Sequence, residues 1–296
     1  MSIGEPKLFE KRALFIACLY KGTAQALDGC NHDQEHLVNY VQSIAPDCEI
    51  RVLTDDNSIN LPSGLTVYGS STHHNITAGL HWLRQAKQMW FSYSGHGSSR
   101  MDKSSTSEEI DHRDETIVPT DWERAGQISD DTMRRELVDH LTEGSRLTAL
   151  FDCCHSGTAL DLRVNYLDQS KSTGFPLFKK YHYDPKAFQR VLVKQEHPRC
   201  ALTKASVCML SGCRDEQTSA DATIKGEYTG AMTFAFLYFS DPKQPGYALR
   251  GKDEKTIGNL LQDMNGWLFA NDYEQRPQLS FGNDSISVDE EWKPFI

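Results

Sequence analysis

The stretch over residues 147–157 constrains the fold of this chain more than any other. It begins with a short apolar run, 147–151, which has the length and composition of a buried parallel strand. The apolar character then stops at an acid, two adjacent cysteines, a histidine and a Ser-Gly pair. In an open α/β sheet, ligands bind at the carboxyl ends of the strands. Reactive side chains at such an end therefore indicate a functional site.

A second strand end supplies a partner for the cysteines. The aromatic-rich run over 88–94 leads into Gly95-His96-Gly97, and a glycine on either side leaves the imidazole uncrowded at the strand tip. A thiol is a weak nucleophile until a base or a nearby cation produces the thiolate. If the two runs are neighbouring strands of one sheet, His96 and a cysteine near 154 lie at the same edge. This arrangement predicts a Cys–His catalytic site.

The order of apolar segments predicts an α/β fold. Strand-like runs alternate with helical periodicity, which indicates βαβ units and a single domain with a mostly parallel central sheet flanked by helices on both faces. We expect residues 28–33 to form a turn and 98–115 a long polar loop. Within the domain we expect a short extension over 1–10, a large catalytic region over 11–162, a basic mobile loop over 163–205 and a small region over 206–296. The expected strands are 12–20, 48–53, 88–94, 147–151, 207–211 and 278–281, and the expected helices lie near 37–44, 76–83, 130–138, 231–238 and 257–268.

Composition and charge exclude several classes of protein. The net charge is -10 and no Lys/Arg block stands out, so we expect no nucleic-acid partner, whereas a cationic substrate or a bound cation would suit the chain. No apolar run approaches the roughly 20 residues that span a bilayer, and we expect no secretory signal. The eight cysteines form no Cys-x-x-Cys pair, which favours reduced thiols in a cytoplasmic or nuclear compartment.

Two motifs now support a family resemblance. Tyr-Ser-Gly-His-Gly at 93–97 and Asp-Cys-Cys-His-Ser-Gly at 152–157 resemble the paired signatures of the metacaspases, the caspase-fold cysteine proteases of plants, fungi and protists, and of their type I members in particular. Segments 114–119, 123–128 and 211–220 are also similar to that family. The resemblance implies a caspase-like fold with p20-like and p10-like regions. It also implies a monomeric cysteine endopeptidase made as a zymogen, with links to programmed cell death.

The resemblance implies a nucleophile and a base. Position 154 matches the family's catalytic cysteine and His96 matches its base, while Cys153 stands where serine is common in the family. Strand alternation gives independent support, because adjacent residues point to opposite faces and only one of them can meet His96. We therefore expect Cys154 to be the nucleophile and Cys153 to be a buried, inert thiol. Backbone N–H groups near Gly97 and Cys154 are expected to hold the oxyanion.

Acids near the nucleophile predict the substrate. In the metacaspases, residues matching Asp33, Ser94 and Asp152 line a pocket for a basic side chain, with the residue matching Cys30 beside it. Carboxylates favour Arg or Lys through charge-assisted hydrogen bonds. The resemblance thus implies protein or peptide substrates with Arg or Lys at the cleaved position. A turn or cap role is the alternative for Asp33.

A calcium site and self-processing also follow from the resemblance. Asp114, Asp130, Asp131 and Asp161 resemble the family's Ca²⁺ site, and such a hard cation needs several oxygen ligands. Solvated acids and helix capping are the alternative. The basic loop offers sites for self-cleavage, or it is a plain solvated insertion. Its candidate positions are Lys179, Lys180, Lys194 and Arg199.

Two other functions stay open at this point. One is a catalytically silent caspase-fold protein that acts in interaction or aggregate handling. The other is a zinc-binding regulator that uses Cys153, Cys154 and His155. Structural zinc usually takes four ligands in paired spacings, and adjacent cysteines without a second pair fit that pattern poorly.

Overall fold

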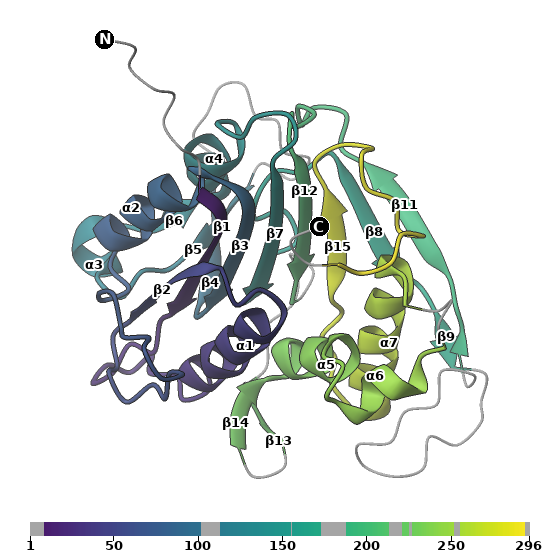
Figure 1. The fold of residues 1–296 in the computed structure, drawn as a ribbon, viewed down its shortest axis with the longest axis horizontal. Coiled ribbons are helices and arrows are strands. Elements are labelled where there is room, and N and C mark those ends of the chain that lie inside the picture. The colour runs from purple at the N-terminus through teal and green to yellow at the C-terminus, as the bar shows by residue number, and fades with distance from the viewer. Residues whose placement is uncertain are drawn as a thin grey trace.

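An eight-stranded sheet forms the centre of the molecule. The computed structural model describes residues 9–101, 113–154, 156–172, 188–212, 221–224, 227–251 and 255–293. The strand order is β11-β8-β15-β12-β7-β3-β1-β2, and helices lie on both faces (Figure 1). The strands of this sheet are β1 (Phe9–Ala17), β2 (Glu49–Thr54), β3 (Ala86–Ser94), β7 (Arg146–Asp152), β8 (Val164–Asp168), β11 (Leu192–Glu196), β12 (Ser206–Ser211) and β15 (Gln278–Phe281). The predicted fold class is confirmed.

Smaller strands and the helices surround this sheet. The strands outside it are β4 (Gly97–Met101), β5 (Arg113–Ile117), β6 (Ile128–Ser129), β9 (Lys171–Ser172), β10 (Phe188–Gln189), β13 (Asp221–Ile224) and β14 (Glu227–Gly230). The helices are α1 (Cys30–Ile44), α2 (His73–Leu83), α3 (Trp122–Ala125), α4 (Asp130–Met133), the π-helix η1 (Arg134–Val138), α5 (Ala231–Ser240), α6 (Pro245–Leu249) and α7 (Ile257–Ala270).

The five strands that carry the site are parallel. β2, β1, β3, β7 and β12 pair in parallel, while β15 runs antiparallel to both of its neighbours. All five therefore end at the same edge of the sheet, which is where parallel α/β sheets bind ligands. β3 and β7 are direct neighbours, as the sequence predicts.

Side chains alternate between two hydrophobic cores, one on each face of the sheet. Along β3, Trp90 packs in the core under α1, α5 and α7, whereas Met89, Phe91 and Tyr93 pack in the core under α2 and η1. The two-residue period of a strand produces this division. Because both faces are covered, the central strands are apolar throughout, and this is why they can be recognised in the sequence.

Three expectations about local structure are wrong. Residues 28–33 are not a turn, because α1 begins at Cys30 and Asp33 lies in its first turn. The expected loop over 98–115 contains β4 and β5, which pair antiparallel. The expected loop over 163–205 contains β8 and β11, which extend the central sheet, with β11 at its edge. β11 is largely exposed at the sheet edge, so its sequence is polar and lacks the apolar signal of the central strands.

The rest of the predicted fold matches the structure. Each expected central strand and helix is present, with boundaries that shift by a few residues. Of the residues described, none belongs to a helix that combines the length and the apolar character needed to cross a bilayer.

A buried ion network ties the last helix to the polar segment before β11. The Asp263 side chain in α7 is 1% exposed and lies 3.0 Å from Arg250 Nε, and it also pairs with Arg190. Asp263→Ala removes the carboxylate that faces both guanidinium groups, and it should lower the free energy of unfolding by about 3 kcal/mol in urea titrations.

Asp47→Ala is the matched control. It breaks a pair with Lys11 in which the aspartate is 60% exposed and the charges are screened by solvent, so the expected loss is much smaller than in Asp263→Ala. Equal losses in the two variants would contradict a stabilising role for the buried network.

Candidate active site

The parallel register of β3 and β7 aligns the two strand tips. Ser94, the last residue of β3, lies opposite Asp152, the last residue of β7. His96 and Cys154 each follow two residues later, so they leave the sheet at the same edge. The predicted convergence of the two motifs on one edge is therefore present in the fold.

Gly97 brings these tips into direct contact. A Cβ placed on Gly97 would lie 1.8 Å from the carbonyl oxygen of Cys154 and 3.3 Å from Cys153 Sγ. Real Cβ atoms do not approach a carbonyl oxygen so closely, and only glycine lets the backbones approach this far. The residue after His96 thus packs on the backbone of Cys154.

The two cysteines lie in different environments. Cys153 is 1% exposed and packs in the core under α2, together with Phe151. Cys154 is half-buried. A half-buried Cys154 beside a core Cys153 agrees with strand alternation, which turns adjacent side chains to opposite faces. Within the described chain, neither cysteine belongs to a group of three or more potential metal ligands, and His155 lies outside the described residues.

The imidazole of His96 has a fixed orientation. Its Nε2 lies 2.8 Å from the carbonyl oxygen of Gln25, in the loop between β1 and α1. A carbonyl oxygen only accepts hydrogen bonds, so Nε2 carries the proton and Nδ1 is the basic nitrogen of the neutral ring. Nothing in the sequence identifies Gln25 as the residue that orients His96, because every residue type has the same carbonyl group.

Two acids meet at the junction of β14 and α5. Asp33 Oδ1 accepts hydrogen bonds from Thr229 Oγ1 and from the Gly230 N–H, both at 2.7 Å. Asp152 Oδ2 accepts from the N–H and the hydroxyl of Thr233, at 2.9 and 2.8 Å. The predicted pair of pocket acids is thus held by one short segment about 200 residues along the chain from Asp33. Sequence reasoning missed both threonines.

Both acids lie directly against the backbone of Gly230. A Cβ at this position would lie 2.1 Å from Asp152 Oδ2 and 3.0 Å from Asp33 Oδ2. The two acids are only 7% and 2% exposed. Two carboxylates in such a confined space form a strongly anionic environment that suits a guanidinium or an ammonium group.

The other two predicted pocket residues lie beside the acids in the fold. Ser94 ends β3 opposite Asp152, is 1% exposed, and its hydroxyl accepts a hydrogen bond from Gln34 Nε2 at 2.8 Å. Cys30 is the first residue of α1, one helical turn before Asp33, and packs against Ala17 and Leu19. All four predicted residues therefore come from α1 and from the ends of β3 and β7.

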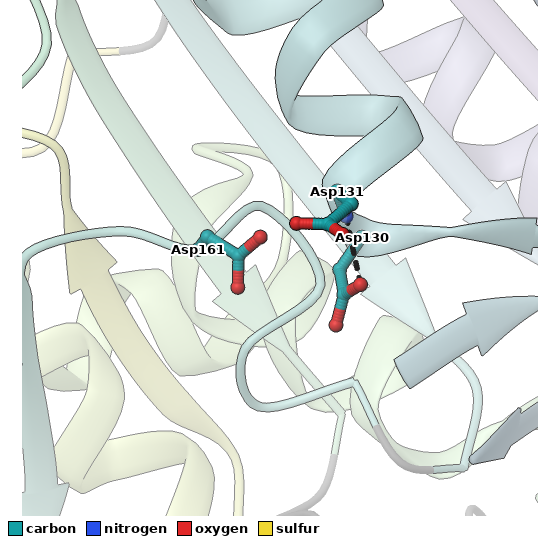
Figure 2. A group of neighbouring side chains, drawn as sticks. All are labelled: Asp130, Asp131 and Asp161. Atoms are coloured by element: carbon teal, nitrogen blue, oxygen red, sulfur yellow. Dashed lines mark hydrogen bonds between the residues drawn. The ribbon is translucent and has the colours of Figure 1, made fainter. Parts of the chain in front are cut away.

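Three of the four predicted calcium ligands form a group. One carboxylate oxygen from each of Asp130, Asp131 and Asp161 lies within 4.8 Å of the others, as Figure 2 shows. Asp130 is fully buried and accepts hydrogen bonds from the N–H groups of Asp131 and Glu115, both at 2.7 Å. Burial, together with the negative charge of Asp161, raises the pKa of Asp130 to about 8. The donors are all hard oxygens, which fit Ca²⁺.

Asp114 does not belong to this group. It lies in β5 opposite Arg100 of β4, and the Arg100 Nε is 3.0 Å from its carboxylate. Asp161, in contrast, lies in the same connection as Cys154 and has a positive φ of 47°. The acidic group therefore links the start of α4 to the segment that follows the predicted nucleophile.

The comparisons with known proteins identify the family. Residues 11–163 match the family model described as metacaspase, peptidase C14 domain. Metacaspase-1 of Mycosarcoma maydis is 33% identical over 303 residues, which cover 92% of this chain and 70% of that protein. The chain belongs to the metacaspases.

Other similar proteins agree with this assignment. Metacaspase-1 of Yarrowia lipolytica is 35% identical over 92% of this chain and 61% of its own length. The crystal structure of protein GSU0716 from Geobacter sulfurreducens has a TM-score of 0.59 and 18% identity, covering 97% and 98% of the two chains, and shows the fold alone. As a metacaspase, the protein is a cysteine protease that hydrolyses peptide bonds.

The contact at Gly97 can be tested in this metacaspase. In Gly97→Ala the new methyl group forces the strand tips apart, and a displacement of about 1 Å can cost about 100-fold in rate. We expect at least about a 100-fold loss of kcat/KM for labelled casein, in a variant whose circular dichroism shows a folded protein.

Gly69→Ala is the control, because its Cβ would meet only side-chain atoms, the Asn75 amide nitrogen at 3.2 Å and a Leu53 methyl carbon at 3.7 Å. Its activity should stay within about twofold of wild type. Wild-type activity in Gly97→Ala would show that the tips need not touch.

Proposed function

We propose that this metacaspase is a calcium-activated endopeptidase that cleaves after Arg or Lys and processes itself. The observation that carries the specificity is the convergence of Asp33 and Asp152 on Gly230, at the sheet edge where Cys154 and His96 emerge. A buried anionic pair next to a nucleophile selects a cationic side chain and disfavours an acidic one.

The proposed chemistry uses Cys154 as nucleophile and His96 as base. His96 Nδ1 takes the thiol proton, the thiolate attacks the scissile carbonyl, and the resulting tetrahedral intermediate collapses to an acyl-enzyme as the imidazolium protonates the leaving amine. The hydrogen bond from Nε2–H to the Gln25 carbonyl supports this assignment, because it fixes the ring tautomer. Backbone N–H groups near Gly97 and Cys154 would stabilise the oxyanion.

Burial makes the acid pair selective. Each carboxylate already accepts hydrogen bonds, Asp33 from Thr229 and Gly230, and Asp152 from Thr233. These hydrogen bonds fix the directions of both groups before a substrate arrives. A preorganised carboxylate loses little entropy when it binds a guanidinium or an ammonium group, and an acidic side chain would meet like charge at short range.

Calcium activation is supported by the acidic group at Asp130, Asp131 and Asp161. A bound Ca²⁺ would neutralise the repulsion among these carboxylates. Because Asp161 lies in the connection that follows Cys154, ligation would also order that connection. A second contact works in the same direction, since the Thr158 hydroxyl donates to Glu115, whose N–H donates to Asp130.

Self-processing would use the segment between β8 and β12. Lys179 and Lys180 lie outside the described residues. Lys194 is a poor candidate, because it lies within β11 and pairs with β8, whereas a protease binds its substrate as an extended strand that has no other partner. Arg199 is exposed in a turn after β11 and remains a candidate.

A pair of fluorogenic peptides tests the proposed specificity. With calcium present, a peptide with Arg at the cleaved position should be hydrolysed at least about 100-fold faster than its Asp counterpart, because the like-charge contact costs several kcal/mol. Asp152→Ala should remove most of this preference. Cys154→Ala should abolish turnover of both peptides.

Cys153→Ala is the matched control, since it removes the neighbouring core thiol and should leave the protease active. Activity that survives in Cys154→Ala would overturn the nucleophile. Cleavage of the Asp peptide alone would overturn the acidic pocket. Cleavage of neither peptide would overturn the proposed specificity for Arg or Lys.

Calcium binding can be measured through the thermal stability of the protein as well as through the rate of peptide hydrolysis. If Ca²⁺ binds at the acidic group, saturating calcium should raise the melting temperature by about 5 °C over a chelated sample. Asp130→Asn and Asp161→Asn should abolish this shift. Asp284→Asn, at a residue whose side chain is 80% exposed, should retain it. A shift that persists in Asp130→Asn would place the calcium elsewhere.

A further inference from the structure

A buried tyrosine between β1 and α1 contacts the face of the His96 ring. Tyr20 is 3% exposed, and its ring stacks on the imidazole with 4.8 Å between centroids and 29° between planes. The sheet edge supplies no other ring contact to His96 among the described residues. The imidazole is thus held on one face by Tyr20 and at Nε2 by the Gln25 carbonyl.

The Tyr20 hydroxyl also holds the backbone of His96. It accepts a hydrogen bond from the His96 N–H at 2.9 Å and donates to the Val118 carbonyl oxygen at 2.6 Å. A second phenol, Tyr93, donates to the His96 carbonyl oxygen at 2.8 Å, and the two phenol oxygens are 3.3 Å apart. Both backbone polar groups of His96 therefore bind a tyrosine hydroxyl.

The backbone of Tyr20 has an unusual conformation that makes these contacts possible. Its φ is 52°, in the left-handed region that bulky residues rarely adopt. The chain turns there, with the Thr23 N–H bonded to the Tyr20 carbonyl and the Leu27 N–H bonded to the Leu19 carbonyl. This turn places Gln25 against His96. Strain of this kind persists where the surrounding contacts impose it, and such sites are often functional.

We propose that Tyr20 is a positioning residue that fixes the ring plane and the backbone of His96 for proton transfer at Nδ1. This inference rests on the proposed role of His96 as the base. It assigns the hydroxyl of Tyr20 a part in the turnover step and none in substrate binding, because its contacts reach His96 and Val118 and not the acid pair at Gly230.

The protonation state of the phenols supports the geometry. Burial raises the pKa of Tyr20, and also that of Tyr93, well above the ordinary value. Both hydroxyls therefore stay protonated at any pH at which the protease works, and they remain able to donate to the Val118 and His96 carbonyl groups.

Tyr40 provides a matched comparison. It is also buried, at 4% exposure, and its hydroxyl accepts a hydrogen bond from Trp292 Nε1 at 3.3 Å. It packs in the core on the opposite face of the sheet from Tyr20. Loss of its hydroxyl thus reproduces the stability cost of a buried Tyr→Phe change without touching His96.

The experiment compares Tyr20→Phe with Tyr40→Phe in the full chain, using the peptide substrate that the wild type hydrolyses best. Phenylalanine keeps the ring stack and removes the hydrogen bond to the His96 N–H. We expect kcat to fall about tenfold or more in Tyr20→Phe, with KM within about twofold of wild type. Tyr20→Leu, which also removes the aromatic ring, should lose about 100-fold. Tyr40→Phe should change neither constant.

Thermal melts and two further variants separate the outcomes. If Cys154→Ala and His96→Ala are inactive while Tyr20→Phe matches Tyr40→Phe, the positioning role is wrong and the proposed function stands. If His96→Ala keeps its activity, the proposed function itself fails. One further outcome is that the loss of kcat in Tyr20→Phe disappears once the temperature is low enough for the variant to be fully folded. That result would mean that Tyr20 only stabilises the fold, and it would overturn the inference.

Discussion

The contact between Gly97 and the backbone of Cys154 is the constraint on which the site depends. It exists because β3 and β7 are parallel neighbours in a register that places Ser94 opposite Asp152. Parallel strands end at a common edge, so two motifs that are distant in sequence meet there without any long-range adjustment. The hydrophobic cores on both faces hold this register, since a shift by one residue would move every core side chain to the wrong face.

The acid pair adds a second constraint of a different kind. Asp33 and Asp152 are almost fully buried, and a buried carboxylate is unfavourable unless hydrogen bonds or charges compensate for its lost hydration. Thr229, Gly230 and Thr233 supply such hydrogen bonds from the junction of β14 and α5. The last third of the chain therefore completes a site whose reactive groups all lie in the first half or just beyond it.

The core strands could be predicted from the sequence because burial on both faces makes most of their residues apolar. β3 and β7 are the clearest cases, and their ends mark the site. The same reasoning failed for β4, β8 and β11, because polar residues interrupt the apolar pattern in each of them. At these places the pairing partner, and not the local sequence, decides the structure.

The candidate site could also be predicted from the sequence only in part. The resemblance to the metacaspases predicted His96 and Cys154 from two short motifs, and it predicted the two pocket acids from matching positions. It could not identify Gln25, Tyr20, Thr229 or Thr233, because backbone carbonyls, aromatic rings and hydroxyl groups occur everywhere in a sequence and gain a role only through contact. It also grouped Asp114 with Asp130, Asp131 and Asp161, whereas pairing with Arg100 in the β4–β5 ribbon directs the Asp114 carboxylate to a different partner.

The sequence by itself determined the alternation of strands and helices, the family, and the reactive residues at the strand tips, since each of these is encoded in a run of a few consecutive residues. Only the tertiary structure decided which groups orient the histidine, that the two acids meet at Gly230, and which three aspartates lie together. These depend on distances between segments that are far apart in the chain. The packing of the whole sheet and its helices sets such distances, so they cannot be predicted from a short stretch of sequence.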